Sequence, residues 1–286
     1  MHSSRAAFAA LVFSVAVTAS LPSQSLESLT LRFAGFTTAS GYEQPVMDSL
    51  LALLPGATRD RLGDVSVRLG SGTPRRLVSC PIDEAGYAVG GITADGYLTL
   101  HREGRITSPL FEQQLEGHRV IVFGASGPLP GVVGVRSVHL TRGRAANETP
   151  FTADDAYVDI GATSAGEAAS LGVRMLSPVA LEKRPHRYGD GVAAPAVGRH
   201  AACAALTAAL LSHPKVMGSL VASFTVQGLQ GGNPGLGSVT ALHGPFADTL
   251  TATLTVKYRE TAAETVLFGD VQALERRIVQ WIGGAK

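Results

Sequence analysis

The sequence predicts an α/β fold that carries an inserted, β-rich domain. Helix-like and strand-like segments alternate in the first and last parts of the chain, whereas residues 87–135 hold short strand-like segments separated by glycines. The 286 residues are 45% hydrophobic and 16% charged, which suits a folded core and is too apolar for a disordered chain. Such an order is typical of an α/β domain interrupted by a β-domain. We therefore assign residues 26–84 and 186–286 to the discontinuous α/β domain and residues 85–185 to the insertion.

The first 25 residues have the pattern of a secretory signal peptide. Arg5 precedes an uncharged apolar stretch from Ala6 to Ala19, and small residues follow at Val17–Ala19 and Ser23–Ser25. The stretch is shorter than the roughly 20 apolar residues of a membrane span, and an uncleaved anchor is the alternative. The sequence therefore predicts an exported protein, secreted or periplasmic, with no membrane contact after signal cleavage.

The first half of the α/β domain is predicted to hold one helix and two strands. Ser40 and Glu43 have the spacing of a capping box, and apolar residues recur at helical spacing up to about Leu54, where Pro55-Gly56 stops the helix. Residues 64–69 alternate between apolar and polar, and residues 76–80 continue as a short apolar strand.

The middle of the chain is predicted to be mostly β-structure. Short strand-like segments lie about ten residues apart between residues 87 and 135, as in a small all-β unit. Residues 156–160 form a strand of the buried type. Ser164 and Glu167 form a second capping box, which opens a short helix that ends near Leu171-Gly172.

The last part of the chain returns to mixed structure. Residues 199–211 are dense in Ala and Leu and predict a helix, and residues 220–227 predict a strand. The glycine-rich residues 228–237 are interpreted as a flexible loop. Residues 250–257 predict another strand, and residues 270–281 predict an amphipathic terminal helix.

Composition excludes several functions. Lys and Arg number 24 and Asp and Glu 23, for a net charge of +1, so no nucleic-acid partner is expected. Aromatic residues make up 6% of the chain, with one Trp, which argues against a surface that stacks sugars or bases. The two cysteines, Cys80 and Cys203, fit either one disulfide or two buried thiols.

Conventional catalytic motifs are weak in this sequence. Residues 124–127 (GASG) lack the spacing of a nucleophile elbow and predict a turn, and residues 231–235 lack the Lys and Ser/Thr of a phosphate loop. His186 with Asp190, or His200 with Cys203, could ligate a metal from one face of a helix. Two ligands are only half of such a site.

Two sequence segments, in this order along the chain, nevertheless resemble one family. Residues 82–89 (IDEAGYAV) and residues 158–164 (VDIGATS), with Glu167-Ala168 and residues 171–173 after them, resemble metallopeptidase family 42, the glutamyl and tetrahedral aminopeptidases. Further matching residues are Ile92, Asp95–Leu98, Gly131–Gly134, His139–Leu140, Ala201–Leu206 and Phe224–Gln227. The resemblance covers nearly the whole chain after the signal segment. It implies a mixed-sheet aminopeptidase-like domain that binds two divalent ions, such as zinc or cobalt, and an inserted small β-barrel-like domain that builds large oligomers.

The resemblance places the metal site of the family on residues without ligand atoms. The ligand His of the family falls on Pro81, the bridging Asp on Gly198, the general-base Glu on Gly228 and the next ligand Glu on Leu229. Asp83, which orients a ligand His in the family, is retained, but its partner is absent. Asp83 and Glu84 are then expected to be structural, Asp83 bonding to a turn and Glu84 exposed or capping.

The end of the chain departs from the family in the same way. Residues 257–261 resemble the late Arg-Tyr-x-His-Ser segment of the family, with Glu260 in place of the ligand His. After Gly235 the chain is several tens of residues shorter than the family pattern, and the next ligand Asp has no counterpart there.

These replacements decide the functional prediction. Two divalent cations about 3.5 Å apart repel by roughly 19 kcal/mol even at an effective dielectric constant of about 20, and carboxylate ligands normally offset that repulsion. We therefore predict no metal cofactor and a catalytically inactive homologue that acts as a binding or assembly module. Its expected partners are a peptide, or another copy or an active paralogue bound through the inserted domain. The alternative is a hydrolase with a rearranged site built from His186, Asp190, His200 or Glu260.

Overall fold

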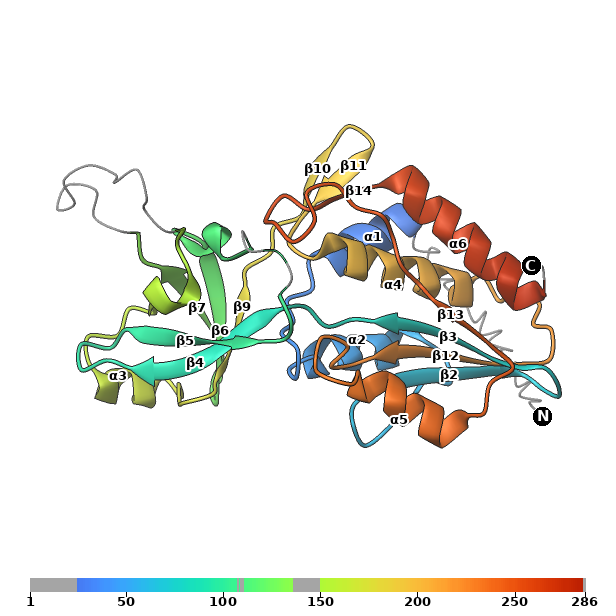
Figure 1. Ribbon diagram of the computed structural model, residues 1–286, viewed down its shortest axis with the longest axis horizontal. Coiled ribbons are helices and arrows are strands. Elements are labelled where there is room, and N and C mark those ends of the chain that lie inside the picture. Colours follow the sequence, from blue (N-terminus) through green and yellow to red (C-terminus); the bar gives the residue numbers. More distant parts are fainter. Residues whose placement is uncertain (1–24, 107, 109–110, 136–149, 285–286) are drawn as a thin grey trace, which may run out of the picture.

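A closed β-barrel lies beside a mixed β-sheet flanked by helices in the computed structural model, which describes residues 25–106, 108, 111–135 and 150–284 (Figure 1). The helices are α1 (Leu26–Ala34), α2 (Gln44–Leu53), α3 (Ala165–Ser170), α4 (Val197–Leu211), α5 (Pro234–His243) and α6 (Phe268–Gly283). Among the described residues, no helix combines the length and apolar character needed to cross a membrane. The signal-peptide segment and the matching pair His139–Leu140 lie outside the described residues, apart from Ser25.

The main sheet has five strands in the order β1-β2-β12-β3-β13. Their bounds are β1 (Thr58–Arg59), β2 (Val65–Gly70), β12 (Ser219–Thr225), β3 (Arg75–Pro81) and β13 (Asp248–Thr251). The central strand β12 pairs parallel with β3 and antiparallel with β2. The sheet is therefore mixed, and the three strands predicted for residues 64–69, 76–80 and 220–227 are confirmed within one or two residues at each end.

Helices cover both faces of the sheet (Figure 1). Most residues of α4 are buried, and its many alanines let it pack closely against α1, α6 and the sheet. The terminal helix α6 buries Val271, Leu274, Ile278 and Ile282 along one face, as the amphipathic pattern predicts. On the opposite face of the sheet, Val239 of α5 packs against the main sheet.

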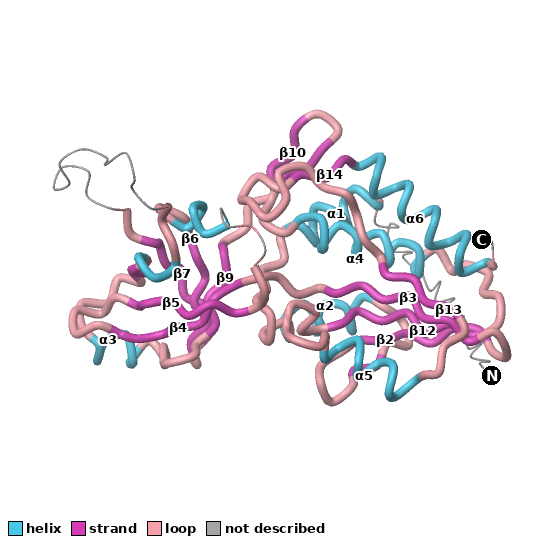
Figure 2. The backbone as a smooth tube through the Cα atoms, in the orientation of Figure 1, coloured by secondary structure: helices cyan, strands magenta, loops and turns pink. Residues whose placement is uncertain are grey.

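Among the described residues, six strands form the closed barrel, in the order β4-β5-β8-β7-β6-β9. Figure 2 shows the strands β4, β5, β6, β7 and β9 together at one end of the molecule. The bounds of the barrel strands are β4 (Gly86–Ile92), β5 (Leu98–Glu103), β8 (Tyr157–Asp159), β7 (Gly127–Val133), β6 (Arg119–Gly124) and β9 (Pro178–Leu181). Alternate residues such as Leu98, Val120 and Val158 point into its core. The expected small β-barrel is confirmed, and residues 125–126 form the turn that was predicted there.

The capping box predicted at Ser40 and Glu43 is wrong. Of the one predicted at Ser164 and Glu167, the cap by Ser164 is confirmed. Helix α2 begins only at Gln44, because Ser40 and Glu43 use their side chains elsewhere. Ser40 Oγ donates to Asp83, and the Glu43 carboxylate accepts from the backbone of Gly41 and Gln227. At α3, by contrast, Ser164 Oγ accepts from the Glu167 amide as predicted.

Two predicted segments near the C-terminus differ from the structure. The glycine-rich loop contains the start of α5, because Asn233 accepts from the Leu236 amide and Pro234 suits the first turn of a helix. The strand predicted for residues 250–257 leaves the sheet after Thr251. Its neighbour β3 ends at Pro81, whose nitrogen carries no hydrogen for further pairing.

Other elements were not predicted. Helix α1 lies directly after the signal-like segment. A second sheet joins β10 (His186–Tyr188), β11 (Gly191–Ala193) and β14 (Thr265–Leu267), and short 3-10 helices occur at Phe111–Leu115 and Ala153–Asp155. Strands of three residues carry too little alternation for a sequence pattern to reveal them.

Two buried acids hold the loop that follows β12. Asp64 Oδ1 accepts from the Val226 amide at 2.9 Å, and Glu43 Oε1 accepts from the Gln227 amide at 2.8 Å. Burial, reinforced by the negative charge of Asp60, raises the pKa of Asp64 to about 7. Burial also raises the pKa of Glu43. The start of this loop is therefore fixed by two carboxyl groups whose pKa values burial raises.

Asp64 is expected to make the protein less stable as the pH rises from 5 to 8. Its folded pKa of about 7 lies above the ordinary 3.8, so its favourable contribution is complete below about pH 4 and is lost as the pH rises through 7. Over pH 5–8 the loss amounts to about 2.5 kcal/mol. Urea unfolding of Asp64→Asn should show a flatter pH dependence than the wild type. The exposed Asp190→Asn is the control, and an unchanged slope in Asp64→Asn would contradict the assignment.

Candidate functional site

A pocket of about 590 Å³ lies where β3, the start of α4 and the loop after β12 meet the first barrel residues. Pro81, Gly198, Leu229 and Glu260 all line it. Gly228 lies next to them, because a Cβ atom placed on Gly228 would be 2.9 Å from Cβ of Pro81. The structure thus brings together the residues that the family resemblance places at the metal site, although they come from distant parts of the sequence.

The two glycines of this group leave no room for a side chain. A Cβ atom on Gly198 would lie 2.4 Å from a Val256 methyl carbon and 3.2 Å from Oε1 of Glu264. One on Gly228 would lie 3.0 Å from Oδ1 of Asp83. Contacts this short require the neighbours to shift. Neighbouring atoms therefore fill the space for a side chain at the positions assigned to the bridging Asp and the general base.

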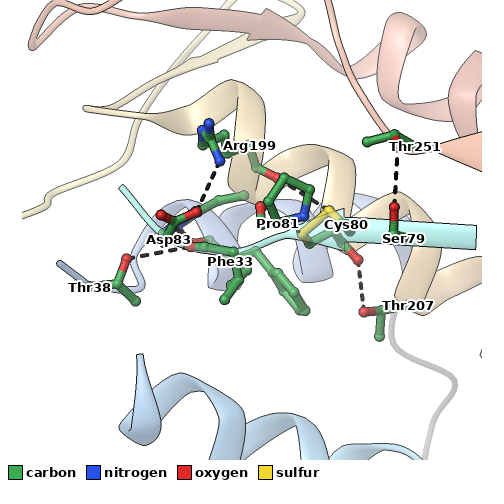
Figure 3. Close-up of a disulfide and its surroundings, with 12 residues drawn as sticks. Phe33, Thr38, Ser79, Cys80, Pro81, Asp83, Arg199, Thr207 and Thr251 are labelled. Atoms are coloured by element: carbon green, nitrogen blue, oxygen red, sulfur yellow. Dashed lines mark hydrogen bonds and ion pairs between the residues drawn. A yellow bond between two sulfur atoms is a disulfide. The ribbon is translucent and has the colours of Figure 1, made fainter. Parts of the chain in front are cut away.

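Asp83 is completely buried, and both of its oxygens already accept hydrogen bonds, one of them from Arg199 (Figure 3). Oδ1 accepts from Nη1 of Arg199 at 3.1 Å. Oδ2 accepts from Ser40 Oγ and from the Leu229 amide, each at 2.8 Å. Asp83 joins the loop before α2, the loop after β12 and the start of α4. The bond from the Leu229 amide agrees with the prediction that Asp83 bonds to a turn.

Glu84 was expected to be exposed or capping, but it is buried and pairs with a buried lysine. Nζ of Lys183 lies 2.6 Å from Oε2 of Glu84, and the backbone and hydroxyl of Thr38 donate to Oε1. Burial raises the pKa of Glu84 and lowers that of Lys183, while their mutual attraction opposes both shifts. Both oxygens of Glu84 therefore already face donors from the protein.

His200 lies beside this pair and is also fully buried. Its Nδ1 lies 2.8 Å from the Phe33 carbonyl and 3.4 Å from Nζ of Lys183, and its Nε2 lies 3.1 Å from the Ile82 carbonyl. Burial, with help from the charge of Lys183, lowers the pKa of His200 well below its usual value. The ring therefore lies at the junction of α1, α4 and the end of β3 within the core.

The carboxylate of Glu264 binds the N-terminal end of α4. Glu264 Oε1 accepts from the Gly198 amide and Oε2 from the Glu260 amide, each at 2.9 Å. Glu260 in turn accepts from the backbone of Ser108. Ala196, which precedes α4, and Glu260 both have left-handed backbone conformations, with φ of 53° and 57°. Such conformations in residues other than glycine often occur at ligand sites.

The two cysteines form a disulfide directly behind the pocket wall (Figure 3). Cys80 precedes Pro81 on β3, and Cys203 lies on α4. This result decides between the two alternatives left open by the sequence. It also removes Cys203 as a metal ligand, so the candidate ligand pair of His200 and Cys203 is excluded.

The alternative hydrolase site is not assembled in the structure. His186 and Asp190 lie exposed in and beside the β10–β11 hairpin, His200 is buried in the core, and only Glu260 lines the pocket. Within the described part of the chain, no three His, Cys, Asp or Glu residues are arranged to hold a metal ion.

Sequence reasoning missed the basic residues around the pocket. Lys183 is buried, whereas Arg199 is partly exposed and Arg105 and Arg259 are exposed. Only Lys183 carried a usable signal, since it follows the apolar residues 178–181 closely. A scattered arginine has no spacing that marks it as a pocket residue.

The fold is shared by solved aminopeptidase structures. Two solved structures share it across 91% of this chain. The TET1 peptidase of Pyrococcus horikoshii, solved as a dodecamer, is 21% identical, with a TM-score of 0.74 over 99% of its own chain. The aminopeptidase APDkam598 of Desulfurococcus kamchatkensis is 16% identical, with a TM-score of 0.78 over 95% of its chain. At these identities the likeness establishes the fold alone.

The chain belongs to the M42 glutamyl aminopeptidase family, whose model matches residues 63–233. It is 31% identical over 175 residues to SgcX of Escherichia coli K12, covering 58% of this chain and 46% of SgcX. It is 28% identical over 209 residues to the lysyl aminopeptidase of Pyrococcus furiosus, covering 65% of this chain and 59% of that enzyme. The chain thus spans about half the length of the curated relatives it matches.

Proposed function

We propose that this protein is a catalytically inactive M42 family member that uses the former active-site pocket for binding. The observation that carries the proposal is the pair of glycines, Gly198 and Gly228, at the positions of the bridging Asp and the general base. Neighbouring atoms occupy the space that each side chain would need. Losing a general base alone costs on the order of 10²–10⁴ in rate, and here the ligands are replaced as well.

The residues around the pocket do not fit a pair of divalent ions. Pro81, Gly198 and Leu229 have no ligand atoms in their side chains. The nearby carboxylates of Asp83, Glu84 and Glu264 accept hydrogen bonds from protein donors at both oxygens or lie against Lys183. A cation would have to displace these donors and approach the positive side chains of Lys183 and Arg199. We therefore derive no metal-dependent step.

The proposal includes export and self-association. The disulfide supports an oxidising compartment, secreted or periplasmic, because such bonds are rare where thiols are kept reduced. The assemblies formed by the TET1 peptidase of Pyrococcus horikoshii support pairing of this chain with itself or with an active paralogue. We place that contact on the barrel, within the proposed inserted domain of residues 85–185.

The decisive experiment is a metal titration combined with a cleavage assay on the chain from about Ser20 onward. We expect calorimetry with Zn²⁺ and Co²⁺ to show no pair of sites of micromolar affinity. A peptide library should lose no N-terminal residues with either metal present. The affinity tag must be removed first, because histidine tags bind both ions. Two bound equivalents, or cleavage that a chelator abolishes, would overturn inactivity, and light scattering of the same sample reports the oligomeric state.

A further inference from the structure

The pocket offers hydrogen-bond donors that no described residue of the protein uses. Three arginines line it: Arg105, Arg199 and Arg259. Arg199 donates to Asp83 through one terminal nitrogen only. The side chains of Arg105 and Arg259 are exposed and have no acceptor or ion-pair partner within the described ranges. Guanidinium groups stay charged at any physiological pH and match the geometry of a carboxylate.

The carboxylates of the pocket, by contrast, are already engaged. Glu84 is held by Lys183 and Thr38, and Glu264 is held by two backbone amides. Glu260 accepts from the Ser108 amide. A ligand with a positive group, such as the amino terminus of a peptide, would find these oxygens occupied. The unused capacity of the pocket therefore suits an anion.

One wall of the pocket also offers an unpaired backbone. Residues 253–256 continue from β13 and line the pocket. Ala252 still donates to the Ser79 carbonyl, and Lys257 pairs with Thr265. Between them, the amides and carbonyls of residues 253–256 make no backbone hydrogen bond with any described residue. An extended chain can pair with such an edge through its main chain, whatever its sequence.

We propose that the pocket binds an extended peptide by its C-terminal carboxylate, with the main chain of the peptide along residues 253–256 and the carboxylate at the arginines. This assignment rests on the proposed function, since the pocket must be free of metal. It reverses the polarity of an aminopeptidase site, which receives the opposite end of a peptide. A peptide fits better than a small anion because the free edge and the arginines line the same pocket.

The test uses a pool of peptides, fluorescein-Gly-X-X-X, in which X is an equal mixture of Ala, Ser, Val and Leu. Fluorescence anisotropy should give at least tenfold tighter binding for the free carboxylate pool than for the amidated pool. Arg259→Gln should remove most of that difference, and Arg105→Gln should reduce it. Arg276→Gln, an exposed arginine on α6, is the matched control and should leave binding unchanged.

Three outcomes would overturn the proposal. Equal affinity for the two pools, or no binding of either up to millimolar concentration, would exclude recognition of the carboxylate. Equally tight binding of an amidated pool with one internal Glu would assign the arginines to side chains instead. Displacement by acetate as effective as by unlabelled peptide would leave only an anion site. None of these outcomes bears on the proposed loss of catalysis, which the metal and cleavage assays test separately.

Discussion

Replacing Cys80 and Cys203 together by alanine is expected to lower the free energy of unfolding by about 3–5 kcal/mol. The disulfide joins residues 123 positions apart, so its loss frees a very long loop in the unfolded chain. Both cysteines are fully buried, and alanine adds no polar group to the core. Urea unfolding under oxidising conditions, compared with the wild type, measures the effect.

The wild type in excess reductant is the matched control for the cysteine variant. Reduction should lower its unfolding midpoint to nearly that of the double variant, and reductant should leave the variant itself unchanged. A double variant with the same midpoint as the oxidised wild type would show that the disulfide contributes nothing to stability.

Replacing Lys183 by methionine is expected to destabilise the protein by about 3–5 kcal/mol. The substitution leaves Glu84 buried without its cation, and both side chains are almost inaccessible to water. Burial already raises the pKa of Glu84, so the variant should be less stable at pH 8 than at pH 5, since a carboxyl with a raised pKa loses stability as the pH rises. Urea unfolding at the two pH values checks both statements.

The double variant Lys183→Met/Glu84→Gln separates the unpaired charge from the lost packing. The introduced glutamine can still accept from Thr38 and carries no charge, so we expect it to recover most of the stability that Lys183→Met loses. Lys257→Met removes an exposed lysine and should change stability little. If Lys183→Met were as stable as Lys257→Met, the ion pair would have no structural role.

The architecture was largely predictable because most of its elements obey a clear period. The central strands β3 and β12 of the main sheet are short, almost continuously buried runs, barrel strands such as β7 alternate at period two, and α6 carries a single apolar face. The prediction of element boundaries failed where side chains bond to residues far away in the sequence. Ser40 and Glu43 have the spacing of a capping box, but their side chains bind Asp83 and the Gln227 amide instead. In α5, Asn233 supplies a cap that outweighs the glycines around it.

The candidate site was predictable in position and not in chemistry. The family resemblance placed Pro81, Gly198 and Leu229 at one pocket, because the ends of β3 and β12 and the start of α4 meet there. The partners of the surrounding carboxylates could not be predicted. Glu84 precedes the barrel strands in the sequence and Lys183 follows them, so no local spacing encodes their pairing.

The position of the disulfide has a consequence for how the gene can change. All six barrel strands lie between Cys80 and Cys203, so the disulfide closes a covalent loop that contains the described strands of the barrel. A cut, an extension or a deletion among the barrel loops leaves the two halves of the main sheet covalently joined. The barrel can therefore diverge, or be exchanged for another module, while the helices and sheet that shape the pocket keep their register.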